Sequence, residues 1–364
     1  MPSNSGSFRM SGSPPAQVDV LKWAKLVGFA IGMPYVPKCT NHAIDLVAFA
    51  FRKNIQRVKV MACAPSYASD FMSDIQRMFA IAELNTTGTL DTTILRTSDH
   101  PRHEEIVRLA GHLFRRNTQE LMEAAKSPQW DDFVLGKMRD ATQPIFALVM
   151  ENSPIRQGFE AILSACVTGA WTAFETMCGD LWEVALNIQP RKLAGLKGQP
   201  KRFLPSDERK GDGKSRDDDL EIPDTTKIRL SLIGRYGYNL EEKMGTLLRT
   251  IQRFDSLTGI RVAYGSAFAT NNDAIGAALT DKSLDSLAAL RNILVHKSGV
   301  VDETYEKRSK YLPFLPKAPI GMEIALDGEI VSALLVQTIL KSGDLLTAVD
   351  NWITTSLASK DGSE

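Results

Sequence analysis

The chain has 364 residues and carries 43 lysines and arginines against 43 aspartates and glutamates. Its length allows two domains or one elaborated domain. Its neutrality excludes the net basic bias of an abundant nucleic-acid packaging protein, although a local basic groove is still compatible with it. The four cysteines have neither metal-ligand spacing nor the density of a disulfide scaffold. We therefore expect a protein of the reducing cytoplasm without a metal site.

The first residues of the chain favour a soluble protein. Residues 1–17 are rich in serine, glycine and proline, which predicts a disordered tail. They lack the charged and then apolar pattern of a signal peptide. The apolar run from Leu26 to Met33 is too short to span a bilayer, so we expect no membrane association.

A separate, mostly helical N-terminal domain of unknown role is predicted over residues 18–150. The helical spacing of apolar residues is clearest over 43–55 and 104–125. Prolines near the end of this region favour a domain boundary at about 145–157.

The clearest helix of the chain follows this boundary. Apolar residues repeat at three- and four-residue spacing from Phe159 to Leu186, and polar residues occupy the opposite face. A stripe this long and broad indicates packing against several other helices or against a second copy of the protein.

A flexible charged insertion is expected at about 190–223, after Pro190 ends the long helix. Its first part is basic without an acid, and its second part mixes both signs. One interpretation is a solvated, flexible loop, and the other is a basic arm near a phosphate-bearing ligand.

Further elements are predicted in the last third of the chain. A capping box opens a helix expected over 239–254. A glycine-containing loop then leads to a helix over 280–297. Alternating apolar residues predict a short β-hairpin over 322–329, and a final helix covers 330–357.

The helix over 280–297 contains the most informative residues. Arg291 lies in its apolar stripe, where an unpaired guanidinium is unfavourable, and His296 precedes Gly299, which can end the helix. Asn292 shares a helical face with His296. About 140° of helical rotation separates Arg291 from His296, so their side chains point in different directions from one straight helix. Their convergence requires a helix end at His296 or two copies around a two-fold axis, and both agree with a site shared between protomers.

Three blocks of this sequence resemble the HEPN superfamily, and more narrowly its RiboL-PSP-HEPN-type branch. Residues 290–302 resemble the family signature, which is Arg, a polar residue, three variable residues and His. The helix around 170–175 is similar to the family's first long helix, which carries an aromatic residue and then an acid. Residues 324–352 look like its closing strand-and-helix unit. The resemblance covers roughly residues 157–357, and the first 150 residues lie outside it.

The resemblance implies a mainly α fold, in which a HEPN-like helical bundle with a short β-hairpin follows the mostly helical N-terminal region. It also implies a homodimer and, in active members, a metal-independent endoribonuclease that acts on RNA without a cofactor. Such proteins often serve in toxin–antitoxin or antiviral defence systems, so an antitoxin or another defence protein is the implied partner.

The motif residues fit this chemistry. When the 2′-hydroxyl of RNA attacks the adjacent phosphate, an imidazole can move the proton, and a guanidinium can donate two hydrogen bonds to the phosphoryl oxygens. We therefore expect His296 to act as acid and base, Arg291 to stabilise the phosphate, and Asn292 to support them. Glu175 and Lys297 are further supporting candidates, and the sequence assigns no residues to RNA binding.

A non-catalytic interpretation of the motif remains open. Arg291 could form an internal salt bridge to Glu175 or Glu183, with His296 as a C-terminal helix cap favoured by the helix dipole. The chain would then be a HEPN-like dimerisation or interaction module whose N-terminal region or partner carries the activity.

Other sequence motifs give weaker signals. His100, His103, Glu104 and His112 cluster without forming an HExxH motif, and we expect surface histidines near a helix start. The chain has no P-loop, GxGxxG, GxSxG or kinase motif, which argues against nucleotide hydrolysis and dinucleotide redox chemistry.

Overall fold

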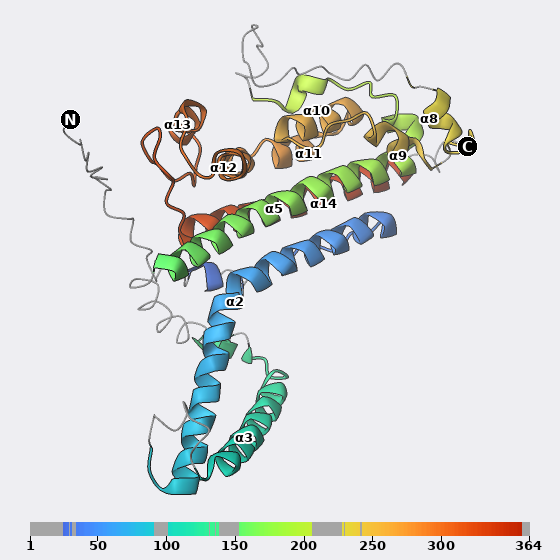
Figure 1. Ribbon diagram of the computed structural model, residues 1–364. Coiled ribbons are helices and arrows are strands. Elements are labelled where there is room, and N and C mark those ends of the chain that lie inside the picture. Colours follow the sequence, from blue (N-terminus) through green and yellow to red (C-terminus); the bar gives the residue numbers. More distant parts are fainter. Residues whose placement is uncertain are drawn as a thin grey trace, which may run out of the picture.

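The computed structural model describes residues 25–28, 30, 34–90, 101–130, 132–134, 136–137, 153–205, 228, 230–240 and 242–358 (Figure 1). Within these residues the fold is mainly helical and contains no strand longer than an isolated bridge, which confirms an all-α class. The predicted tail, most of the predicted domain boundary and the insertion beyond residue 205 lie outside the described residues.

Three long helices form the frame, namely α2 (His42–Thr87), α5 (Ser153–Ile188) and α14 (Gly328–Ala358). The shorter elements are α3 (His103–Ala124), α6 (Pro190–Leu193), η2 (Pro200–Phe203), α8 (Leu230–Gly234), α9 (Met244–Arg249), α10 (Leu257–Ala267), α11 (Asp273–Leu279), α12 (Lys282–Lys297) and α13 (Glu303–Ser309). The helices predicted over 104–125, 280–297 and 330–357 are confirmed. The helix predicted over 239–254 is reduced to α9, because Glu242 takes a left-handed φ of 56° that interrupts it.

α5 forms the centre of the fold. In Figure 1 it runs beside α14, with the first half of α2 on one side and α10 to α12 on the other. Its predicted apolar stripe is buried, as the three- and four-residue spacing requires. Two buried hydrogen bonds fix α10 on α5. The indole N–H of Trp182 donates to the carbonyl oxygen of Ala263 at 3.0 Å. The hydroxyl of Tyr264 donates to the backbone carbonyl oxygen of Cys178 at 2.9 Å.

The backbone just before α2 is hydrogen-bonded to the side chain of Asp350 of α14. This buried carboxylate accepts hydrogen bonds from the backbone N–H groups of Thr40 and Asn41 at 2.6 and 2.9 Å, and the Asn41 side chain caps α2. The first half of α2 then shares one hydrophobic core with α5 and α14. The core therefore continues across the boundary predicted at 145–157, because the apolar face of this half-helix is buried against α5.

The second half of α2 leaves the bundle as an arm. α2 bends between its two halves (Figure 1), and Pro65 lies inside the helix, where a proline removes one backbone hydrogen bond and produces a kink. Beyond the bend, α2 packs against α3 around a separate small cluster of Ala82, Ile106 and Ala110. Among the described residues of the N-terminal region, the arm is the part that has a core of its own.

The insertion predicted at 190–223 is packed in its described part. η2 lies against α10, and its Phe203 is buried. This packing explains two glycines that the sequence pattern places in a loop. A Cβ on Gly265 would lie 2.8 Å from the carbonyl oxygen of Pro200, and one on Gly276 would lie 2.7 Å from the Phe203 ring. The glycines allow close contact with α10 and α11, two helices that the pattern did not predict.

The hairpin predicted over 322–329 does not form. Glu323 instead makes an isolated antiparallel bridge with Val300, which follows α12. Asp327 caps α14 by accepting a hydrogen bond from the backbone N–H of Ile330 at 2.9 Å. The Asp-Gly pair that resembles a turn is therefore the start of a helix.

α5 and α14 are long and apolar enough to cross a membrane by length and composition alone. About half of the most apolar window of each helix is buried inside the fold, 50% in α5 and 56% in α14. Helices at the core of a bundle have the same property, so this is a weak indication of a membrane span.

Candidate functional site

α12 carries the predicted motif and is fixed at its N-terminal end. Asp281 caps the helix by accepting a hydrogen bond from the backbone N–H of Ser283 at 2.9 Å. Arg261 of α10 is only 1% exposed. Its guanidinium donates to both carboxylate oxygens of Asp285 at 2.8 and 3.0 Å and to the carbonyl oxygen of Leu279 at 2.9 Å. This paired arginine fixes the first turn of α12 in the bundle.

The apolar stripe expected on α12 comprises Leu284, Leu287, Ala288, Leu294 and Val295, and it is buried in part. Leu284 and Leu287 lie on the buried face together with Leu290, whereas Val295 is 50% exposed. Arg291 is half-buried and lies at the border of this face. The guanidinium therefore reaches the surface and avoids the desolvation penalty of a buried charge.

α12 ends one residue after His296. Ser298 and Gly299 take left-handed φ angles of 52° and 82°, and the backbone N–H of Gly299 donates to the carbonyl oxygen of Ile293 at 3.0 Å. The helix end expected near Gly299 is confirmed. His296 is consequently exposed in the last helical turn, beside the exposed Lys297.

The end of α12 brings Arg291 and His296 into contact. Nη1 of Arg291 lies 3.3 Å from Nε2 of His296, and it donates to Oδ1 of Asn292 at 3.1 Å. The long arginine side chain spans the angle of about 140° between the two positions. The contact forms within one chain, so a second copy is not needed to bring these side chains together.

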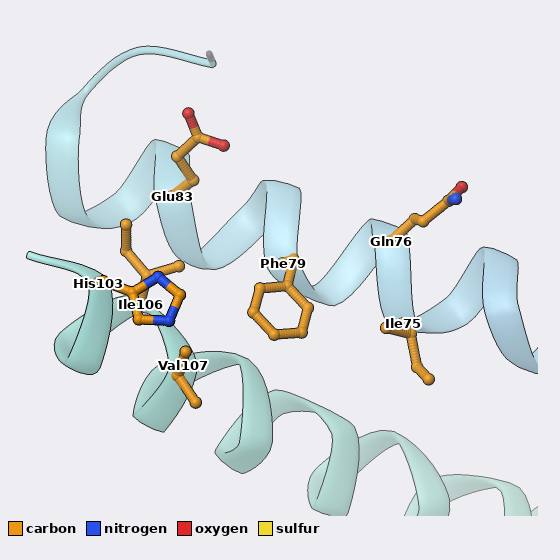
Figure 2. Close-up of a pocket in the computed structure, with 7 residues that line it drawn as sticks. All are labelled: Ile75, Gln76, Phe79, Glu83, His103, Ile106 and Val107. Atoms are coloured by element: carbon orange, nitrogen blue, oxygen red, sulfur yellow. The ribbon is translucent and has the colours of Figure 1, made fainter. Parts of the chain in front are cut away.

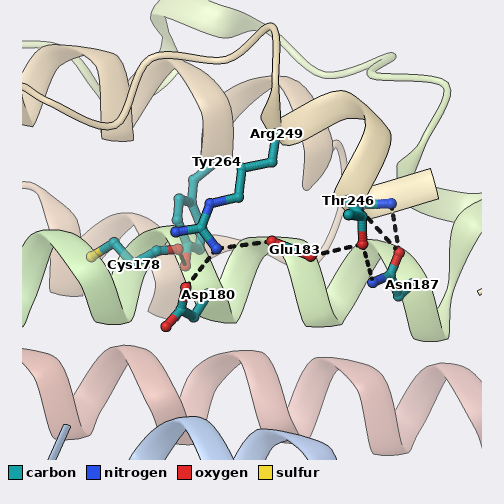
Figure 3. A network of polar contacts seen from close by, with 8 residues as sticks. Cys178, Asp180, Glu183, Asn187, Thr246, Arg249 and Tyr264 are labelled. Carbon is teal, nitrogen blue, oxygen red and sulfur yellow. Dashed lines mark hydrogen bonds and ion pairs between the residues drawn. The ribbon is translucent and has the colours of Figure 1, made fainter. Parts of the chain in front are cut away.

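Arg291 has no ion pair with a carboxylate in the described part of the chain. Glu183, one of its two predicted partners, instead accepts a hydrogen bond from Arg249 at 2.9 Å (Figure 3). The same carboxylate accepts a hydrogen bond from the Thr246 hydroxyl at 2.7 Å, and Arg249 also pairs with Asp180. Glu183 therefore belongs to a different polar network.

Glu175, the other predicted partner, lies on α5 close enough for its charge to interact with that of Arg291. Burial raises the pKa of the Glu175 carboxyl, and the Trp171 indole and the Arg291 charge lower it by less, so the pKa is raised. The Trp171 N–H is buried and has no hydrogen bond of good geometry among the described residues. The apolar stripe assigns Trp171 to the core. Its four-residue spacing from Glu175 is the sequence signal that places it beside this carboxyl.

The thiols are poor candidates for nucleophiles. All four cysteines are free. Burial raises the pKa of Cys39 to about 11 and that of Cys166 to about 12, and it also raises the pKa values of Cys63 and Cys178. Thiols with raised pKa values are protonated at neutral pH and therefore weakly nucleophilic. Within the described ranges, no group of three or more His, Cys, Asp or Glu residues could hold a metal ion.

The arm contains a pocket of about 380 Å³ between the second half of α2 and α3 (Figure 2). It is lined by Ile75, Gln76, Phe79, Glu83, His103, Ile106 and Val107. Apolar side chains from both helices form its walls, and its volume falls within the range of about 300–1,000 Å³ typical of small-molecule sites. Of the predicted histidine cluster, His103 lines this pocket, Glu104 and His112 do not, and His100 lies outside the described residues.

Comparisons with known protein families, with curated proteins and with solved structures found no match for this chain.

Proposed function

We propose that the protein is a metal-independent endoribonuclease of the HEPN type, with His296 as acid and base and Arg291 as the phosphate-stabilising group. The strongest support is the distance of 3.3 Å between Nη1 of Arg291 and Nε2 of His296 at the exposed end of α12. A permanently charged guanidinium and an imidazole, whose ordinary titration lies near neutral pH, are thereby within reach of one phosphodiester.

The contact between these nitrogens favours one form of the imidazole. A guanidinium has only donors, so Nε2 of His296 must supply the lone pair, and the ring proton is then on Nδ1. In this form Nε2 can act as a base. When a phosphate draws Arg291 toward itself, the lone pair of Nε2 becomes free to accept the proton of a 2′-hydroxyl.

The reaction then needs no metal. Nε2 of His296 takes the 2′-hydroxyl proton, the oxygen attacks the adjacent phosphorus, and the bond to the 5′-oxygen breaks, leaving a 2′,3′-cyclic phosphate. The departing oxygen takes a proton from an imidazolium, either that of the same chain or that of a second copy. Arg291 donates to the non-bridging oxygens, where negative charge develops, while Asn292 orients the guanidinium.

We further propose that the protein is a cytoplasmic homodimer that acts as a toxin or an antiviral defence component, with an antitoxin or another defence protein as its partner. This part rests on the resemblance of residues 290–302 to the family signature. Lys297 would add positive charge near the RNA, and Glu175 would help to orient Arg291.

Cleavage of mixed RNA by the purified full-length protein in chelator tests the proposal. Wild type should release fragments with cyclic phosphate ends, and His296→Ala and Arg291→Ala should each reduce the rate by about 10² or more. His103→Ala, which changes a histidine of the arm, is the matched control and should cleave like wild type. Equal cleavage by wild type and both site variants, or no cleavage by any of them, would contradict the proposal.

The pocket in the arm favours a second candidate, a non-catalytic HEPN-like module whose N-terminal region binds a ligand. The pocket has the volume of a small-molecule site, and His103 is among its polar lining residues. If this candidate is correct, RNA stays intact and small molecules that raise the melting temperature lose their effect in Phe79→Ala. RNA cleavage that depends on His296 would instead exclude it.

A further inference from the structure

The first half of α2 exposes one continuous face to solvent. Leu46, Phe49 and Val60 are 56%, 50% and 53% exposed. Together with Lys53 and Arg57, which are also exposed, they lie within an arc of about 80° around the helix. We name these five residues the outer α2 face. In Figure 1 this half of α2 lies on the opposite side of α5 from α12, so the face is remote from Arg291 and His296.

The outer α2 face is positively charged. The ammonium of Lys53 lies 5.4 Å from the centre of the Phe49 ring, and neither Lys53 nor Arg57 has an ion pair with a described carboxylate. The only acidic residue in the first half of α2 is Asp45, which pairs with Arg52 at 3.3 Å. Because the whole chain is neutral, this positive charge is a local property of the face.

We propose that the outer α2 face binds an acidic amphipathic helix of a second protein. Its apolar side chains recur along one side of a helix, which is the arrangement that packs against the apolar stripe of another helix. Lys53 and Arg57 lie between these side chains and complement acidic residues beside such a stripe. The face extends for about 21 Å from Leu46 to Val60, which is about four helical turns of a partner.

Other occupants fit this face less well. In an antiparallel pairing of two copies, the cations of both chains would meet near the centre of the interface, and like charges there oppose association. RNA is held mainly by many phosphate contacts, whereas most of these five residues are apolar. A helix on a membrane surface separates a polar face from an apolar one, but Lys53 lies in the middle of the outer α2 face.

This inference is independent of the proposed ribonuclease activity, because it rests on the charge and exposure of α2 alone. Fluorescence anisotropy with the full-length protein can test it. One labelled probe is a helical peptide of about 20 residues with a leucine stripe flanked by glutamates, and the second probe has lysines in place of the glutamates. We expect the acidic probe to bind at least about tenfold more tightly than the basic one.

Paired variants of the outer α2 face sharpen the test. The double variant Leu46→Ser and Phe49→Ser should weaken binding of the acidic probe about tenfold or more, while Leu230→Ser, at a residue that is 73% exposed on α8, should not. The double variant Lys53→Glu and Arg57→Glu should reverse the preference and bind the basic probe more tightly.

Several results would overturn the proposal. The first is equal binding of the two probes. The second is no binding of either probe at about 0.1 mM, which corresponds to a binding free energy weaker than about 5.5 kcal/mol. The third is an unchanged preference for the acidic probe in the charge-reversed variant. Sedimentation with phosphatidylserine vesicles, titration with an RNA oligonucleotide and concentration-dependent self-association cover the other occupants. If one of these requires Phe49 while the acidic probe does not bind, that occupant replaces the acidic helix.

Discussion

Arg249 and Arg291 both lie beside α5, but their surroundings differ. Arg249 pairs with two carboxylates of α5 (Figure 3). A Cβ on Gly179 would lie only 2.7 Å from its guanidinium. Arg291 lies at the exposed end of α12 and contacts two side chains that carry no carboxylate, Asn292 and His296. One arginine is closely packed and paired, and the other is available to an anion from solution.

The two arginine charges differ in whether carboxylates of the fold neutralise them. Burial lowers the pKa of Arg249, but the hydrogen bonds and charges of Asp180 and Glu183 outweigh this effect and raise it. The charge of Arg249 is thus neutralised within the fold, where it joins α9 to α5. Arg291 lacks such an ion pair among the described residues, which is compatible with its proposed role in binding phosphate.

The comparison extends to Arg261, whose side chain is the most deeply buried of the three. Arg261→Met should have the largest effect, lowering the free energy of unfolding by about 3–5 kcal/mol, because Asp285 then keeps a charge without its partner. Urea denaturation measures this change. Adding Asp285→Leu should recover most of the loss, and a double variant as unstable as the single one would argue against a paired charge.

Arg291→Lys should reduce kcat/KM for RNA about 10- to 100-fold, because lysine is a point charge without the planar fork that binds phosphate. Its melting temperature should stay close to that of wild type, since no ion pair is lost. The rate is measured in chelator, with Arg249→Lys as the matched control. Full activity in Arg291→Lys would remove the need for a guanidinium at this position.

Arg249→Ala should show the opposite behaviour. It removes charge-assisted hydrogen bonds from a partly exposed network, so we expect the free energy of unfolding to fall by about 1–2 kcal/mol. RNA cleavage per folded molecule should be unchanged. If denaturation curves of Arg249→Ala and wild type coincide, the network contributes nothing to stability.

Glu175→Gln should have the smallest effect and one that depends on pH. The folded-state pKa of Glu175 is raised above its ordinary value of 4.5. Protonated Glu175 therefore contributes to the free energy of unfolding at pH values below 4.5, and this stabilising contribution is lost as the pH rises through the folded-state pKa. Melting temperatures measured from pH 4 to pH 7 should show the variant gaining stability relative to wild type as pH rises. A difference that does not vary with pH would contradict the raised pKa.

α5 and α14 could be predicted from sequence because their apolar spacing is dictated by the core that they build. Of α2, the spacing identified the segment 43–55, whereas the helix continues to Thr87. α10 and α11 could not be predicted, because Gly265 and Gly276 resemble loop residues until η2 is seen to pack against them. The bridge between Val300 and Glu323 could not be predicted from sequence either, since it joins residues that are distant along the chain.

The sequence names Arg291, Asn292 and His296 as candidate site residues, and their role stays a prediction. The helical angle alone suggested that the arginine and the histidine point apart, whereas the structure brings Nη1 of Arg291 to 3.3 Å from Nε2 of His296. The arginine side chain is long enough to reach around the last turn of α12 to the histidine, which the angle between the two positions does not reveal.

The buried face of α12 was predicted in part. Leu284 and Leu287 lie on it as expected, but Leu290 and Ile293 complete it in place of Val295, because the neighbouring helices pack against them.

The most direct test of the central claim measures stability and chelator-resistant RNA cleavage side by side in Arg291→Ala and Arg249→Ala. The cleavage assay is run at a temperature at which both variants are folded. We predict that Arg291→Ala loses cleavage and keeps the wild-type melting temperature, whereas Arg249→Ala melts earlier and still cleaves. Cleavage retained in Arg291→Ala, or lost equally in both variants, would contradict the assignment of Arg291 to chemistry and of Arg249 to the fold.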